Sequence, residues 1–189
     1  AMSVNGDLGS DGGSITVGGR LGSIIVGGRL AEGDLLSDLT VAGNVSAIKV
    51  YGAFPGSLDI GGNLGRLQVT GDVGELGDTL NIGGNLSNMT IGDKLTESDI
   101  VSDMTIGGRL GTIKVTGDIE NSLDVAANTG RITAGRIFGD ITIGGNLSYL
   151  ETGSGIISSG TPGVDYEFVN VGFPVNGTLS VDGTIGTIV

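Results

Sequence analysis

Two groups of closely spaced carboxylates stand out in this chain, because carboxylates are the usual protein ligands of hard cations. The groups are Glu32, Asp34 and Asp38, and then Glu97, Asp99 and Asp103. Calcium takes about six to eight oxygen ligands, which closely spaced acids and backbone carbonyls in a loop can supply. The other interpretation, which we favour, is that these acids keep the protein soluble and that Asp38 or Asp103 caps the following strand. Calcium is therefore a candidate ligand and not a required cofactor.

A second candidate site combines aromatic rings with acids near the C-terminal end. Its residues are Tyr149, Asp165, Tyr166, Glu167, Phe168 and Phe173. Most of them lie in the segment 151–178, which interrupts the regular pattern, and long loops in compact domains are commonly functional or covering. Aromatic rings stack on sugar rings while carboxylates bind sugar hydroxyls, so this segment could bind a carbohydrate. Alternatively, residues 164–171 alternate well enough to form a short strand packed over the side of the domain, and we favour this packing interpretation.

The composition excludes several kinds of chemistry. The chain has no histidine and no cysteine, which removes Ser–His triads, Cys–His pairs, disulfides and the usual zinc sites. Its net charge is −12, with 21 acidic residues against 9 basic ones, whereas nucleic-acid binders need the opposite balance. No apolar run reaches the roughly 18 residues that cross a bilayer. Nucleic acid and membrane insertion are therefore not expected.

The composition does not exclude a polysaccharide lyase or hydrolase. Lyases of this kind need a basic residue beside calcium-binding acids, and glycosidases need two facing carboxylates. The acids gather in segments of variable length that contain no lysine or arginine, namely 9–14, 31–38, 55–57, 74–79, 96–103, 120–122, 139–140 and 157–178. Because a basic partner is missing from this acidic edge, we predict a non-enzymatic protein.

The elements that position these residues come from a nine-residue unit. In residues 58–66 (LDIGGNLGR), apolar residues occupy the first, third and seventh positions, and Gly-Gly-Asn lies between them. Alternation at the start predicts a short strand facing a core, and the glycines allow the left-handed backbone of a tight corner. Steps of nine residues alternate with steps of variable length, so two units make one coil. All insertions then leave the coil at the same corner.

A longer repeat lies over this one. Residues 15–74 match residues 80–139 at an offset of 65, insertions included, so that LAEGDLLSD at 30–38 returns as LTESDIVSD at 95–103. Three-coil super-repeats are therefore predicted, with one insertion in the seventh coil. Their limits are about 2–66, 67–131 and 132–189, and the insertion spans 151–178. Internal repetition of this kind is typical of solenoid proteins.

Together these patterns predict an all-β fold, a single-stranded parallel β-helix that forms one domain over residues 1–189. About eight coils of roughly 18–24 residues would stack with parallel ladders about 4.8 Å apart, and right-handed winding is expected by extension from parallel crossovers. Inward residues are expected in two columns, one through Val41 and Ile60 and one through Val50 and Val69. Neither end carries a predicted helix or polar cap, so we expect a piece of a longer array or a rod that stacks end to end.

The runs ITVGGRLGSIIVGGRL, LDIGGNLGRLQVTGDV and ITIGGNLSYL resemble parallel β-helix repeats of very large secreted or surface-displayed bacterial proteins. The resemblance covers nearly the whole chain outside 151–178. It implies an extracellular or cell-surface stalk, adhesin or polysaccharide-contacting module. Our prediction is a non-enzymatic extracellular structural or adhesive rod whose partners are a polysaccharide or cell-surface component and neighbouring repeats. The alternative is a carbohydrate-binding module, assisted by calcium, that uses the segment 151–178.

Overall fold

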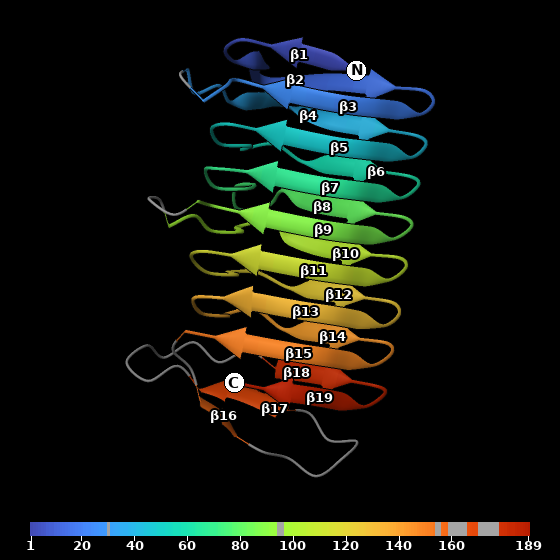
Figure 1. Cartoon of the computed structure of the whole chain (residues 1–189), viewed down its shortest axis with the longest axis vertical. Helices are drawn as coiled ribbons and strands as arrows, with labels where there is room; N and C mark the ends of the chain where they lie inside the picture. Colours follow the sequence, from blue (N-terminus) through green and yellow to red (C-terminus); the bar gives the residue numbers. More distant parts are fainter. Residues whose placement is uncertain (30, 94–96, 154–155, 159–165, 170–177) are drawn as a thin grey trace.

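The structure is a computed structural model that describes residues 1–29, 31–93, 97–153, 156–158, 166–169 and 178–189. The chain winds as a parallel β-helix of about seven turns, close to the eight predicted, and the described residues form no helix. They therefore include no helix that could cross a membrane. In Figure 1 the odd-numbered strands up to β15 lie in front and run to the left, the strands behind them run to the right, and the chain descends. The winding is therefore right-handed, as predicted.

Two sheets form the faces of the rod, and successive coils add one parallel strand to each. Sheet A consists of β1 (Met2–Val4), β3 (Leu21–Val26), β5 (Val45–Val50), β7 (Leu64–Val69), β9 (Leu86–Ile91), β11 (Leu110–Val115), β13 (Thr129–Ala134), β15 (Leu147–Thr152) and β19 (Ile185–Ile188). Sheet B consists of β2 (Leu8–Val17), β4 (Leu35–Val41), β6 (Leu58–Ile60), β8 (Thr79–Ile82), β10 (Asp103–Ile106), β12 (Leu123–Val125), β14 (Ile141–Ile143), β18 (Thr178–Val181), β17 (Tyr166–Val169) and β16 (Ile156–Ser158).

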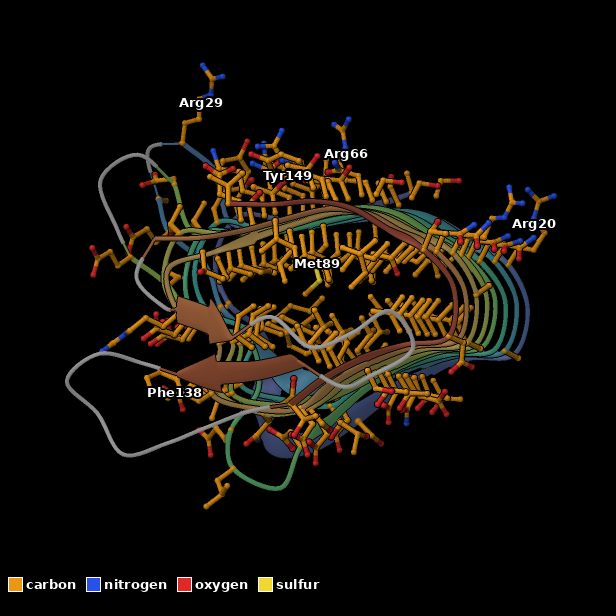
Figure 2. The ribbon with its side chains drawn as sticks, turned by 90° about the horizontal axis from the view of Figure 1, so that it is seen from below. Arg20, Arg29, Arg66, Met89, Phe138 and Tyr149 are labelled. Atoms are coloured by element: carbon orange, nitrogen blue, oxygen red, sulfur yellow. The ribbon has the colours of Figure 1, made fainter. Side chains whose placement is uncertain are left out.

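The predicted columns of apolar side chains fill the space between the sheets, as the end-on view in Figure 2 shows. Val41 stacks on Ile60 and Ile60 on Ile82 in sheet B, while Val50 stacks on Val69 in sheet A. All five are at most 1% exposed. Burying each such side chain contributes roughly 1.5–3 kcal/mol, so the two columns hold the coils together along the whole rod.

A third buried column, which is not one of the two expected, runs along the corner of variable length. Its members are Leu35, Phe54, Val73, Ile100, Ile119 and Ile137. From Phe54 to Ile137, successive members are joined by single parallel bridges rather than by full strands. Each coil thus places one apolar residue into the core, either inside its insertion, as with Leu35 and Ile100, or beside it at the seventh position of a unit, as with Phe54 and Val73. The insertions are anchored to the rod by this residue.

The Gly-Gly corner is held by a ladder of asparagines. The side-chain Oδ1 of Asn44 accepts a hydrogen bond from the backbone N–H of Asn63 at 2.8 Å, and Asn63 in turn accepts from Asn85 at 2.8 Å. The glycines of this corner do not adopt the left-handed backbone that we expected, because the positive-φ glycines lie elsewhere. Glycine is needed here because the neighbouring coil leaves no room for a side chain: a Cβ on Gly84 would lie 2.5 Å from Asn63 Oδ1.

The described residues of the segment 151–178 include two further strands, β16 and β17, at the C-terminal end. β17 pairs antiparallel with β18, with Tyr166 opposite Leu179, and β16 pairs antiparallel with β17. A strand is therefore present where the alternation indicated one, but it pairs edge to edge with sheet B instead of packing over the side of the rod. A further parallel coil would meet β17 at this edge of sheet B, whereas sheet A ends on the parallel strand β19. The two sheets therefore end differently at this end of the rod.

Candidate functional site

The acidic edge is built on a column of aspartates that precede the third apolar column by one residue. These residues, which we call the aspartate column, are Asp34, Asp72, Asp99 and Asp118, together with Asp7, which precedes Leu8, the residue that pairs with Leu35 in the neighbouring coil. Oδ1 of Asp34 accepts a hydrogen bond from the backbone N–H of Ala53 at 2.7 Å, and Oδ1 of Asp99 accepts one from Asp118 at 2.6 Å. Asp7 and Asp72 bind the next coil in the same way. The carboxylates therefore stabilise the corner by hydrogen bonds to the backbone.

The six predicted calcium ligands fall into three positions of the coil. Asp34 and Asp99 belong to the aspartate column, whereas Asp38 and Asp103 lie at the outer face of sheet B. Oδ1 of Asp38 accepts from the Ser57 N–H at 2.8 Å, and Oδ1 of Asp103 accepts from the Ser122 N–H at 3.1 Å. Asp38 and Asp103 thus brace the following coil, as the capping interpretation expects. The remaining two, Glu32 and Glu97, are exposed.

Two grooves on the acidic edge correspond to each other across the 65-residue repeat. The first, of about 270 Å³, is lined by Glu32, Asp34, Gly52, Ala53, Thr70, Gly71 and Asp93. The second, of about 340 Å³, is lined by Glu97, Asp99, Thr116, Gly117, Asp118, Gly135, Arg136 and Gly153. Each groove therefore contains two of the three predicted ligands of its group and excludes Asp38 or Asp103. In the described part of the chain, no three Asp or Glu side chains are grouped so that they could hold a metal ion.

A basic residue does lie on the acidic edge, contrary to the prediction. Nε of Arg136 donates to Asp118 Oδ2 at 2.9 Å, its terminal nitrogen binds the same oxygen, and its guanidinium lies 5.0 Å from the Phe138 ring centre. The hydrogen bond with Asp118 raises the pKa of Arg136. Arg136 precedes Ile137 just as Asp118 precedes Ile119. Aligning these two Xaa-Ile pairs would have placed Arg136 on the edge from sequence alone.

Glu120 lies close enough to the aspartate column for the negative charge of the column to affect its pKa. The protein displaces part of the water around this carboxyl, and the like charges of Asp99, Asp118 and Asp72 add to the effect, so the pKa of Glu120 is raised above its usual 4.5. Arg136 partly opposes the shift. A raised carboxyl pKa is a feature of general acids, but Glu120 does not line either groove. The raised pKa therefore reflects first the partial burial of this carboxyl and then the negative charge of the neighbouring aspartates.

Only one residue of the predicted carbohydrate site has a described side chain. Tyr149 lies on the outer face of sheet A (Figure 2). The Arg131 guanidinium lies 4.3 Å from the Tyr149 ring centre, and the Tyr149 hydroxyl donates a 3.3 Å hydrogen bond to Glu151 Oε2. Arg131 also forms a 2.7 Å ion pair with Glu151. Tyr166, Glu167 and Phe168 belong to β17, whose backbone alone is described, and Asp165 and Phe173 lie outside the described residues. One face of the Tyr149 ring is therefore already covered by a cation.

Comparison with protein-family models, with curated proteins and with solved structures finds no match to this chain. The function must therefore be argued from the residues and their geometry.

Proposed function

We propose that this chain is a non-enzymatic structural or adhesive module, a rigid rod that belongs to a secreted or cell-surface bacterial protein. The observation that carries the proposal is the use of polar side chains at both corners. The asparagines of one corner and the aspartates of the other accept backbone N–H groups from the next coil. The residues best suited to bind ligands or move protons are thus part of the scaffold.

Rigidity follows from the way each coil is held. Parallel ladders join it to its neighbours through both sheets, and three apolar columns run through its core. Where a coil has asparagine at one corner or aspartate at the other, a side-chain hydrogen bond to the next coil is added. In a solenoid, each repeat contacts only its neighbours, so bending requires several of these contacts to break together. Such a rod holds whatever it carries at a defined distance.

Small-angle X-ray scattering tests the rod. We expect an elongated particle whose length grows by about 4.8 Å for each added coil, so deletion of one three-coil block should shorten it by about 14 Å. A compact particle would contradict the proposal. The absence of catalysis is tested separately with a panel of neutral and acidic polysaccharides, where release of reducing or unsaturated ends by the purified chain would overturn it.

The cellular location needs its own test. Antibodies against the purified chain should label intact cells of the source organism without permeabilisation, and external protease should remove the label. Labelling that appears only after lysis would contradict an extracellular rod. A glycan array addresses adhesion: binding that is lost in Tyr166→Ala or Phe173→Ala would instead favour a carbohydrate-binding module built on the segment 151–178.

A further inference from the structure

The two faces of the rod carry opposite charge. The strands of sheet A contain four basic residues, Lys49, Arg66, Lys114 and Arg131, and one acidic residue, Glu151, which is already paired with Arg131. All four basic residues lie at outward positions, and Figure 2 shows Arg66 projecting from this face. Arg66, Lys114 and Arg131 are exposed. Sheet A is thus a basic surface on a protein of net charge −12.

The outer face of sheet B is acidic instead of basic. Its outward positions include Asp38, Asp59, Asp103 and Asp124, all exposed. The strands of sheet B contain no lysine or arginine within the described ranges. Between the aspartates lie short polar residues such as Thr40 and Thr105. The face is therefore flat and acidic.

The charges of the two faces occur in the same coils. Asp38 and Lys49 lie on the consecutive strands β4 and β5, and Asp59 and Arg66 on β6 and β7. The next coil, β8 and β9, has no charged residue in its strands. The pattern then returns, with Asp103 and Lys114 on β10 and β11, and Asp124 and Arg131 on β12 and β13.

This matching cannot serve the stability of a single rod. The basic and acidic side chains of one coil point away from each other on opposite sides of an apolar core, and facing sheets lie about 10 Å apart. Outward charges are then farther apart than the screening length of about 8 Å at physiological ionic strength. The duplication accounts for the repetition along the axis but not for the placement of a base and an acid on opposite faces of one coil.

We propose that the outer face of sheet A docks against the outer face of sheet B of a second copy of this chain, with the two rods parallel and level. In this arrangement Lys49 lies across from Asp38 of the neighbouring copy, and Arg66 lies across from Asp59. A slip of one coil sets an uncharged coil against a charged one, so the level arrangement forms the most pairs. The interface joins two different faces and does not close on itself, so repetition gives an open side-by-side layer of rods. The inference rests on the proposed structural function and adds its partner.

Two opposing effects set the conditions for this contact. The net charge of −12 repels copies at long range, and exposed ion pairs are individually weak. At an ionic strength of about 0.15 M, the long-range repulsion is screened beyond about 8 Å while pairs in contact persist, and at about 1 M the pairs are screened too. Association should therefore be concentration-dependent at about 0.15 M and should be lost at about 1 M.

The test uses two variants that each damage one face. Arg66→Glu/Lys114→Glu reverses charge on sheet A, and Asp59→Lys/Asp124→Lys reverses charge on sheet B. Each variant alone should lose the fast-sedimenting species that the wild type shows in analytical ultracentrifugation at high concentration. Each keeps the other face intact, so an equimolar mixture should recover association as one-to-one pairs. The control matched to the sheet A variant is Arg20→Glu/Arg109→Glu, which lowers the net charge by the same amount at the Gly-Gly corner, where Figure 2 shows Arg20, and it should associate like the wild type.

Three results would overturn the inference: a wild type that stays monomeric at millimolar concentration, single-face variants that associate as the wild type does, or a mixture that stays monomeric. Association that occurs only when alginate is added would also overturn it, because the occupant of sheet A would then be an acidic polysaccharide. Scattering from the same samples separates this inference from the proposed function. Elongated monomers that never associate refute the lateral contact alone, whereas compact particles refute the rod.

Discussion

The side-chain oxygen of Asn63 accepts a 2.8 Å hydrogen bond from the backbone N–H of Asn85, which occupies the same corner one coil further on. The Asn85 side chain donates to the same oxygen at 3.1 Å and uses its own oxygen for Arg109. One residue type thus serves as both donor and acceptor in a ladder that follows the rod axis. The corner is stabilised without a turn-specific backbone conformation.

Loss of one ladder residue should weaken the corner. We expect Asn63→Ala to lower the free energy of unfolding by about 1 kcal/mol, because it removes a hydrogen bond to an otherwise unpaired backbone N–H. Urea denaturation at neutral pH measures the change. Asn81→Ala is the control, since Asn81 lies on the face of sheet B and its side chain donates only a long, 3.4 Å bond to Thr79. Equal effects of the two substitutions would contradict a ladder role for Asn63.

Gly84→Ala tests close stacking at the same corner. The added Cβ would lie 2.5 Å from Asn63 Oδ1 and 3.0 Å from backbone atoms of Gly62, so we expect a loss of about 1–3 kcal/mol, the usual range for overpacking. Gly19 occupies the same turn position in an earlier coil, and a Cβ there meets nothing within 4 Å. Gly19→Ala should therefore change stability by less than about 0.5 kcal/mol. The interpretation fails if Gly19→Ala costs as much as Gly84→Ala.

The third apolar column should matter as much as the two predicted ones. Phe54 is 0% exposed, and we expect Phe54→Ala to cost about 3–5 kcal/mol because it leaves a cavity. Leu76 lies on the same variable corner but is 88% exposed, so Leu76→Ala should fall within about 0.5 kcal/mol of the wild type. Thermal or chemical unfolding followed by circular dichroism measures both. A small effect of Phe54→Ala would mean that the insertions are not anchored by this column.

Glu120 should make stability depend on pH. Its pKa is raised above 4.5 in the folded protein, so the folded state holds this proton more tightly and loses stability as pH rises from 4.5 through the folded pKa. Glu120→Gln should therefore raise the unfolding midpoint at pH 7, and the two midpoints should converge at about pH 4. Glu75→Gln, on the same edge, is the control for removal of one exposed negative charge. A Glu120→Gln midpoint that is not higher at pH 7 would contradict the raised pKa of Glu120.

Calcium addition tests the remaining metal hypothesis. Because Asp34 and Asp99 already accept backbone hydrogen bonds, we expect millimolar calcium, the range of weak extracellular sites, to leave the unfolding midpoint where an equal concentration of magnesium leaves it. A calcium-specific rise would contradict this expectation. If that rise disappeared in Glu32→Gln/Glu97→Gln, whose side chains are exposed in the two grooves, it would establish a site there.

Much of the coil can be predicted from the sequence because the same short pattern of buried and exposed residues recurs in every coil. A buried residue such as Ile60 must recur at the same phase in every coil, so the pattern at Val41, Ile60 and Ile82 is visible without coordinates. The seventh position of the unit marks Val73 as apolar, but Ile100 lies inside the insertion 96–103, so the sequence pattern does not show that the two residues form one column. The same pattern assigns Arg136 to a regular unit, although it lies on the acidic edge beside Asp118.

The sequence alone determined the stacking of coils. Glycine, asparagine and apolar residues recur at fixed intervals, and this allows only a winding in which each residue lies against a residue of the same type in the next coil. Only the tertiary structure decided which carboxylates bind backbone N–H groups, how β17 meets β18, and that Lys49 and Asp38 point to opposite faces of one coil. These relations depend on which residues face each other across a corner, an edge or the core. Distance along the chain carries no information about them.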